Sequence, residues 1–203
     1  MSFWQQHRIR LDPWPIDYEA AMAAETEEET ETAGVVDLDV EYELDQWQAI
    51  PPPKNLQIPD QLVFVDGRRR LDARFLGEKA QAPVYGAFAT FAVGAVQLTR
   101  SIPRAEFVEL QVHRAIATGA ELKPEPLRLG NAQNLAYETC LTGTENTPVS
   151  PMTLVQAQMI QAEKQVIERW QGNGSLVFCD GPLRSGLRVA NNTVGYVKTI
   201  GKS

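Results

Sequence analysis

The chain is poor in cysteine and has no long hydrophobic run. Its 203 residues include only two cysteines, Cys140 and Cys179, and these lack the spacing of a zinc site. A reduced, cytoplasmic setting is the simplest interpretation of this cysteine usage. No apolar run approaches the ~20 residues of a membrane-spanning helix, and the first residues lack the apolar core of a secretion signal. We therefore expect a cytoplasmic protein with no membrane partner.

Lysine and arginine are scarce in the first quarter of the chain. Residues 1–53 hold 13 Asp and Glu but only 2 Lys and Arg, whereas residues 54–203 hold 13 and 17, so the net charges are −11 and +4. An acidic leader before a basic body is either a solvating tail or a mimic of phosphate that covers a binding face. We therefore expect an acidic leader over residues 1–53, partly disordered or acting as a docking arm, and one folded domain over residues 54–203.

Two apolar runs end in the same dipeptide. Residues 62–65 lead into Asp66-Gly67, and residues 176–179 lead into Asp180-Gly181. An apolar run bounded by a turn signal is typical of a buried strand, so each glycine is predicted to start a turn. Each aspartate would then lie at the carboxyl edge of a sheet, where open α/β folds bind ligands. Because a buried acid costs roughly several kcal/mol unless it is paired or holds a cation, the pair suggests a divalent-metal site.

The remaining pattern predicts strands on both sides of one helix. Alternating apolar and polar residues, joined by short connections, favour an antiparallel meander, and Ser150-Pro151 is a suitable helix cap. We expect strands ending at Asp66 and Asp180 and over residues 85–99, 106–114 and 195–200, a helix over residues 153–171, and loops over residues 117–151. This order predicts an α/β fold, a mixed sheet in which the helix crosses over from the meander to a parallel strand.

A third acid lies on the predicted helix. A helical projection places Glu163 at the centre of the apolar face, where a charged residue needs an explanation. One interpretation is a buried ion pair, for example with Arg184 or Lys198. The other is a carboxylate directed toward the two strand-end aspartates. Three clustered anions raise one another's pKa and favour a hard cation, and all-oxygen ligands favour Mg²⁺ or Mn²⁺ over zinc.

These motifs together resemble the NurA nucleases of DNA end processing. The resemblance covers roughly residues 60–200 and rests on Asp66-Gly67, Glu163, Asp180-Gly181-Pro182-Leu183 and Val194-Gly195-Tyr196-Val197-Lys198. NurA proteins have an RNase H-like core, in which three antiparallel strands with an acid on the first are followed by helices and a parallel strand with another acid. The resemblance therefore implies an RNase H-like nuclease domain over residues 54–203.

The resemblance also implies roles for individual residues. Asp66, Glu163 and Asp180 match the metal-binding acids of the family, and Lys198 matches a recurring lysine. The implied activity is metal-dependent hydrolysis of DNA, exonucleolytic or endonucleolytic, in end resection and double-strand break repair. Two Mn²⁺ or Mg²⁺ ions about 3.5–4 Å apart would be bridged by Asp66. The implied partners are DNA and a HerA-type hexameric ATPase. The oligomeric state is left open, with a homodimer as one alternative.

Basic residues next to the first aspartate are candidates for holding the DNA backbone. Arg68, Arg69 and Arg70 could contact phosphates, although a plain solvated charge run is equally ordinary. Lys198 either touches a phosphate or forms a salt bridge with an acid.

The sequence departs from the NurA pattern in two places. Arg68 stands where the family often has serine, and family members continue beyond the last strand with a segment that supplies a histidine. The expectation is therefore an incomplete nuclease domain. This favours an alternative function, a catalytically inactive RNase H-like module that binds DNA or a partner ATPase. We discount an aspartyl phosphotransferase, since such enzymes usually carry a second Asp two positions after the first.

Overall fold

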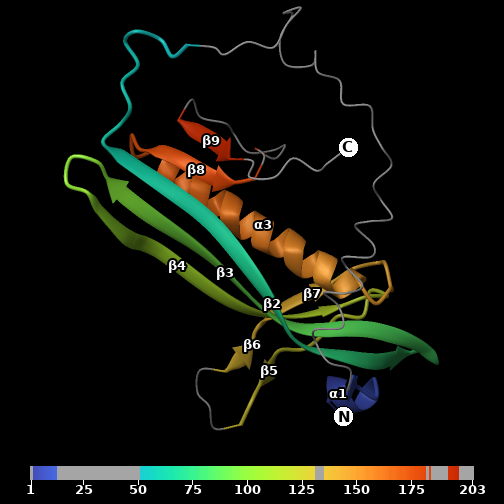
Figure 1. Ribbon diagram of the computed structural model, residues 1–203. Coiled ribbons are helices and arrows are strands. Elements are labelled where there is room, and N and C mark those ends of the chain that lie inside the picture. The colour runs from blue at the N-terminus through green and yellow to red at the C-terminus, as the bar shows by residue number, and fades with distance from the viewer. Residues whose placement is uncertain (1, 13–50, 131–134, 182, 184–191, 197–203) are drawn as a thin grey trace, which may run out of the picture.

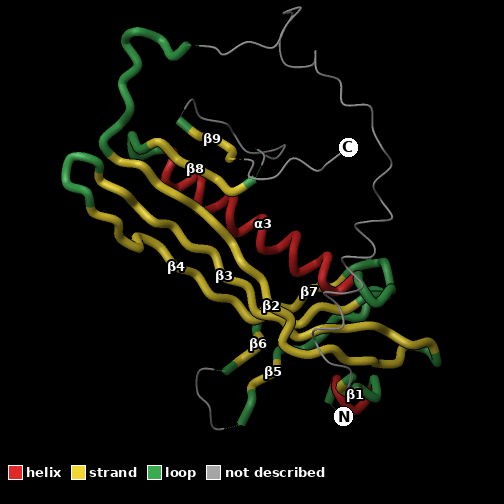
Figure 2. Tube along the Cα trace, in the orientation of Figure 1, coloured by secondary structure: helices red, strands yellow, loops and turns green. Residues whose placement is uncertain are grey.

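The computed structural model describes residues 2–12, 51–130, 135–181, 183 and 192–196 (Figure 1). Within these ranges the chain forms one long antiparallel meander, one long helix, and several short elements (Figure 2). The elements are α1 Phe3–Gln6, β1 Arg10–Leu11, β2 Gln61–Lys79, β3 Ala82–Thr99, β4 Arg104–Thr118, β5 Leu127–Arg128, β6 Ala136–Tyr137, β7 Thr139–Thr142, α3 Ser150–Gln171, β8 Leu176–Asp180 and β9 Thr193–Tyr196.

A mixed sheet organises the fold. Its strand order is β7-β4-β3-β2-β8-β9, with β1 added to β2. β2, β3 and β4 are antiparallel neighbours, after which α3 crosses back and β8 pairs in parallel with β2. β9 then pairs in parallel with β8. This confirms the predicted α/β class, with an antiparallel meander, a crossover helix and a parallel strand, and it is compatible with an RNase H-like fold.

The first strand is much longer than the sequence suggested. The turn predicted at Gly67 is wrong, because β2 continues through Asp66 and Gly67, and Gly67 pairs with Val93 of β3. The hairpin instead turns at Ala80 and Gln81, whose φ angles of 50° and 67° lie in the left-handed region. The strand continues because β3 offers it an unbroken antiparallel partner over its whole length.

The stretch predicted to be loops contains the short strands β5, β6 and β7. β5 and β6 pair with each other in a separate small sheet, whereas β7 joins the edge of the main sheet beside β4. The last strand begins two residues earlier than predicted, at Thr193, and residues 197–200 lie outside the described residues.

The helix α3 covers one face of the sheet (Figure 1). It begins at Ser150, and Pro151 lies in its first turn as predicted, but Ser150 is not the cap. The cap position is Val149, and the Ser150 hydroxyl bonds to Thr147 instead. Buried helix residues follow the spacing of three and four that places them on one face. Val155, Met159, Ala162 and Val166 pack on Val63, Val65, Phe91, Val93 and Val177 of the sheet. Met152, in the first turn, packs on Leu71 and Ala87 instead.

The carboxyl end of α3 is fastened to β4 by Glu109. The Glu109 carboxylate forms an ion pair with Arg169 and accepts a hydrogen bond of 3.2 Å from Trp170 Nε1. Burial by itself would raise the pKa of Glu109, but the hydrogen bonds from Arg169, Gln111 and Trp170 outweigh it and lower the pKa. The ionised carboxylate therefore stabilises the position of the helix.

Residues 2–12 pack on the far end of the meander. Phe3 is only 5% exposed, and the Trp4 ring stacks on Phe88 with 5.8 Å between centroids. The backbone N–H of Asp12 donates to the carbonyl oxygen of Arg74 at 2.9 Å. Part of the expected leader therefore contacts the body of the protein, whereas residues 1 and 13–50 of it lie outside the described residues.

The face of the sheet opposite α3 carries exposed apolar side chains. Phe64 on β2 shares a row with Val96 and Phe107 through the strand register, and Phe107 is 76% exposed. None of the described helices is long and apolar enough to cross a membrane.

Candidate functional site

Asp66 and Asp180 occupy matching positions on neighbouring parallel strands. The register pairs Val65 of β2 with Cys179 of β8, so the two aspartates come next on their strands. Neighbouring strands lie roughly 4.8 Å apart, which brings the two carboxylates within reach of a common ligand. Both aspartates line one pocket with a volume of about 400 Å³. The structure thus brings together two of the three predicted acids.

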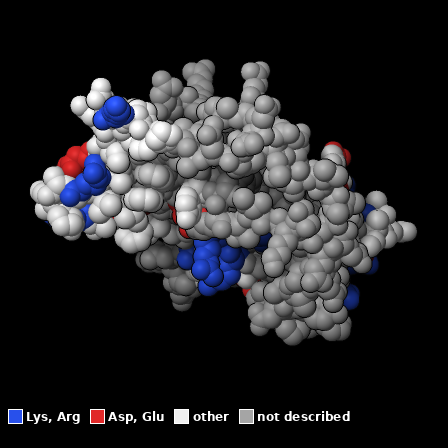
Figure 3. Space-filling view, turned by 45° about the horizontal axis from the view of Figure 1, so that its top comes forward, with Lys and Arg blue, Asp and Glu red and all other residues white. Residues whose placement is uncertain are grey.

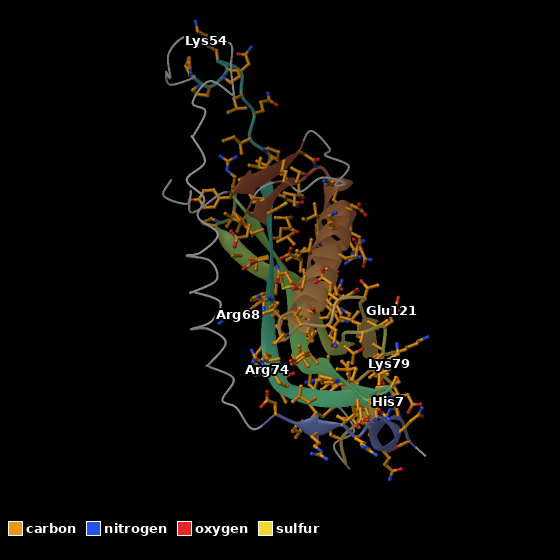
Figure 4. The ribbon with its side chains drawn as sticks, turned by 90° about the vertical axis from the view of Figure 1, so that its right-hand side faces the viewer. His7, Lys54, Arg68, Arg74, Lys79 and Glu121 are labelled. Atoms are coloured by element: carbon orange, nitrogen blue, oxygen red, sulfur yellow. The ribbon has the colours of Figure 1, made fainter. Side chains whose placement is uncertain are left out.

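The pocket opens on the face of the sheet that α3 leaves uncovered. Val65 and Cys179 are buried in the core beneath α3, and successive strand residues point to opposite faces. Asp66 and Asp180 are accordingly exposed. Arg68 lies two residues further along β2 and projects away from α3 (Figure 4). The two carboxylates and one arginine therefore share the same side of the sheet.

Glu163 approaches from the other side. It is half-buried, at the flank of the buried helix face rather than at its centre. Its carboxylate lies against Gly67, since a Cβ built there would be only 3.0 Å from Glu163 Cδ. Its charge also reaches Cys179 of β8. Among the described residues, no group of three or more Asp, Glu, His or Cys is arranged to hold a metal ion. Glu163 is thus adjacent to the aspartate pocket but does not enter it.

Cys179 is part of the core beneath α3. It is buried, and this burial, together with the charge of Glu163, raises the pKa of its thiol to about 11. A thiol with this pKa stays protonated near neutral pH, so Cys179 is a packing residue here rather than a nucleophile.

The turn at Asp180-Gly181 contacts Gly195 and Tyr196 of β9. β8 ends at Asp180, and Gly181 follows with a φ of +83°, which confirms the predicted turn there. The N–H of Gly181 donates to the carbonyl oxygen of Tyr196 at 2.9 Å. A Cβ at Gly195 would lie 2.8 Å from the carbonyl oxygen of Gly181, so only glycine fits against this turn. Glycine at both positions therefore fixes how the chain leaves the pocket.

The three consecutive arginines do not act as one group. Arg69 points to the helix side, where its Nε donates to Gln156 Oε1 at 2.6 Å. Arg70 forms a 2.8 Å ion pair with Asp72, whose side chain is 11% exposed. Arg68 is exposed on the pocket side of β2. By alternation along β2, Arg68 and Arg70 both lie on the face of the two aspartates, but Arg70 is paired with Asp72, and Arg68 is the arginine nearer to Asp66.

Asp72 joins Arg70 to a second, separate network. Its carboxylate accepts hydrogen bonds from Thr90 Oγ1 at 2.6 Å and from the Tyr137 hydroxyl at 3.0 Å. Burial, followed by the charge of Asp72, raises the pKa of Tyr137 to about 12. The hydroxyl therefore remains a donor, and Arg70 contributes to the folded structure at this end of β2.

Two predicted residues cannot be placed. Lys198 and Arg184 both lie outside the described residues, as do the predictions that depend on them: the two roles given for Lys198 and the ion pair suggested for Glu163. Lysine and arginine side chains gather near the middle of the face drawn in Figure 3.

Three aromatic residues of the pocket were missed by the sequence analysis. Phe64, Phe178 and Tyr196 line it beside the two aspartates. The Phe64 and Phe178 rings stack with 5.0 Å between centroids and 13° between their planes. A signal was present, because each phenylalanine stands two residues before an aspartate and strand residues two apart share a face.

No protein-family model matches the chain, and no curated protein matches it. The fold and the site define a class, an α/β protein whose mixed sheet carries an acidic, aromatic pocket at the carboxyl end of β8, beside the middle of β2.

Proposed function

We propose that this protein is a divalent-metal-dependent nuclease that hydrolyses phosphodiester bonds in DNA, acting in end resection and double-strand break repair in the cytoplasm. The observation that carries the proposal is that Asp66 and Asp180 line one pocket from neighbouring parallel strands, where β8 ends beside the middle of β2. The resemblance of the surrounding motifs to NurA nucleases agrees with it.

The residues of the pocket fit a hard divalent cation. Mg²⁺ is usually bound through one or two carboxylates together with water and substrate phosphates, and Asp66 and Asp180 supply two exposed carboxylates on the open face of the sheet. When bound, Mg²⁺ or Mn²⁺ would activate water and stabilise the leaving oxygen. A two-ion site also needs Glu163, whose carboxylate lies one residue from Asp66 on the helix side.

Arg68 is the residue best placed to hold the DNA backbone. Its exposed guanidinium on the pocket side of β2 would pair with a phosphate and orient the strand across the two aspartates. Such a contact releases counterions, so DNA binding should weaken as salt rises, and Arg68→Ala should reduce that dependence.

A second candidate function is a catalytically inactive module that binds DNA or a partner ATPase of the HerA type. The observation that favours it is the position of Glu163, against Gly67 and outside the aspartate pocket. In this case the acidic segment 13–50 would serve as the docking arm, since it holds all but one of the acids of the leader. Replacing it with a neutral linker of equal length, while keeping residues 2–12, should then weaken the complex. Unchanged affinity would contradict the docking arm.

Cleavage of end-labelled DNA in Mn²⁺, Mg²⁺ or EDTA separates the two candidates. For the nuclease, we expect metal-dependent cleavage that falls at least ~100-fold in Asp66→Asn and Asp180→Asn, the scale of losing one essential electrostatic group. Glu168→Gln is the matched control, because Glu168 is an exposed acid of α3. DNA binding by the wild type without cleavage in any metal would favour the inactive module.

A further inference from the structure

The pocket beside the two aspartates is largely aromatic. Phe64 is 43% exposed and Tyr196 is 60% exposed, although both lie on strands of the main sheet. The core beneath α3 is built from the alternate residues of β2 and β8, so the packing of the helix does not require these rings. Exposed aromatic rings that converge on one pocket are typical of a binding site.

The rings and the carboxylates are interleaved. Phe64 stands two residues before Asp66 on β2, and Phe178 stands two residues before Asp180 on β8. Tyr196 of β9 is the register partner of Asp180. Each ring is therefore about one pleat or one strand spacing, roughly 5–7 Å, from a carboxylate. Any group held by the aspartates has an aromatic surface directly beside it.

The pocket has room for one planar group. Its volume of about 400 Å³ falls within the range of roughly 300–1,000 Å³ that is usual for small-ligand pockets. The Phe64 and Phe178 rings are nearly parallel and stacked on each other, so a planar ligand would extend this stack on the outer face of a ring rather than lie across both rings. Arg68 adds a positive charge on the same face.

We propose that Phe64, Phe178 and Tyr196 form a stacking surface for one unpaired nucleobase of the DNA strand whose phosphate would be held at Asp66 and Asp180 through a divalent cation. This inference rests on the proposed function and names its substrate class, a single-stranded or frayed DNA end. Bases inside a duplex are stacked on their neighbours, and only an unstacked base can lie on a protein ring. Because every base has a π face, such a site selects for strandedness rather than for sequence.

If a base stacks on these rings, part of the affinity for single-stranded DNA needs no metal. Two carboxylates repel a phosphate in the absence of a cation, whereas base stacking does not depend on charge. Anisotropy of a labelled oligothymidylate in EDTA therefore measures stacking without cleavage. We expect Phe64→Ala to weaken binding about 5- to 150-fold, the range for losing one stacked base, and Phe64→Trp to retain it.

Phe107→Ala is the matched control. Phe107 is an exposed aromatic on the same face of the sheet, two strands away from Phe64 in the same row. We expect it to bind DNA like the wild type. Melting temperatures of both alanine variants check that the fold is intact, which is expected because both side chains are exposed.

An abasic scan provides the second measurement. Removing one base from the oligonucleotide should weaken binding to the wild type at one position and have no further effect on Phe64→Ala. If Phe64→Ala binds as tightly as Phe107→Ala while the wild type still cleaves DNA, the stacking surface is overturned and the nuclease stands. If the wild type neither binds nor cleaves DNA, the proposed function fails, and the inference fails with it.

Discussion

The same dipeptide, Asp-Gly, has two different structures in this chain. At Asp180-Gly181 the strand ends and the glycine turns with a positive φ of 83°. At Asp66-Gly67 the strand continues, and the glycine is an ordinary paired residue. Gly181 is needed for its backbone conformation, whereas Gly67 is needed because the Glu163 side chain occupies the space where a Cβ would be. Identical local sequences thus satisfy different physical constraints.

The neighbours of each strand explain the difference. β2 has an antiparallel partner in β3 that extends well beyond Gly67, so ending the strand there would leave many backbone groups of β3 unpaired. β8 has only short parallel pairings, which end at Asp180. Both aspartates still lie on the same face of the sheet, because the parallel register pairs Val65 with Cys179 and each aspartate is the next residue on its strand.

Adding a methyl group at Gly67 tests whether the Glu163 side chain is what excludes a Cβ there. We expect Gly67→Ala to cost about 1 kcal/mol, at the low end for overpacking, because the atoms in the way belong to the outer part of the flexible Glu163 side chain, which must rotate aside. At an unconstrained strand position the same change would be stabilising by roughly 0.5–1 kcal/mol. Urea denaturation gives the free energy of unfolding. In a Glu163→Ala background the cost should vanish, and a cost that persists there would show that Glu163 is not its cause.

Gly181→Ala should destabilise the fold by a different mechanism, the strain of a positive φ at this position. A Cβ at Gly181 meets nothing within 4 Å, but the positive φ is strained for any other residue. We expect a cost of about 1–2 kcal/mol, the usual penalty for this conformation. The same denaturation experiment in the Glu163→Ala background should give an unchanged cost. Rescue by Glu163→Ala at this position would contradict the distinction between the two glycines.

A weaker test concerns the anchor that holds α3, and with it Glu163, over the sheet. The folded-state pKa of Glu109 is lowered from its ordinary value of 4.5, so its stabilising effect is complete above about that pH and is lost as the pH falls through the folded-state pKa. We expect the stability difference between the wild type and Glu109→Gln to be constant near neutral pH and to shrink in acid. A difference that grows in acid would have the wrong sign for this anchor.

Much of the fold could be predicted from the sequence. The helix begins within three residues of its predicted start, because its apolar residues recur at the helical period. The meander and the parallel return strand followed from alternation and from the order of elements. The extension of β2 was missed, since Gly67 and three arginines read as a turn and a charged run. In an antiparallel sheet with one open face, however, such polar residues are compatible with a strand.

The site was predicted less completely. Asp66 and Asp180 come together because equal apolar runs set an equal register, which the sequence does contain. The side from which Glu163 approaches depends on how α3 lies across the sheet, a tertiary feature with no local sequence signal. The aromatic pair Phe64 and Phe178 was overlooked although its spacing to the aspartates is visible, because both were counted only as strand formers.

Thermal denaturation in a Mn²⁺ titration tests most directly whether Asp66 and Asp180 hold one divalent cation. At a free Mn²⁺ concentration of about 100 times the dissociation constant, we expect the wild-type melting temperature to rise by roughly 5–10 °C. The rise should disappear in Asp66→Asn and in Asp180→Asn and persist in Glu168→Gln. No rise in the wild type, or an equal rise in all four proteins, would contradict a metal site in this pocket.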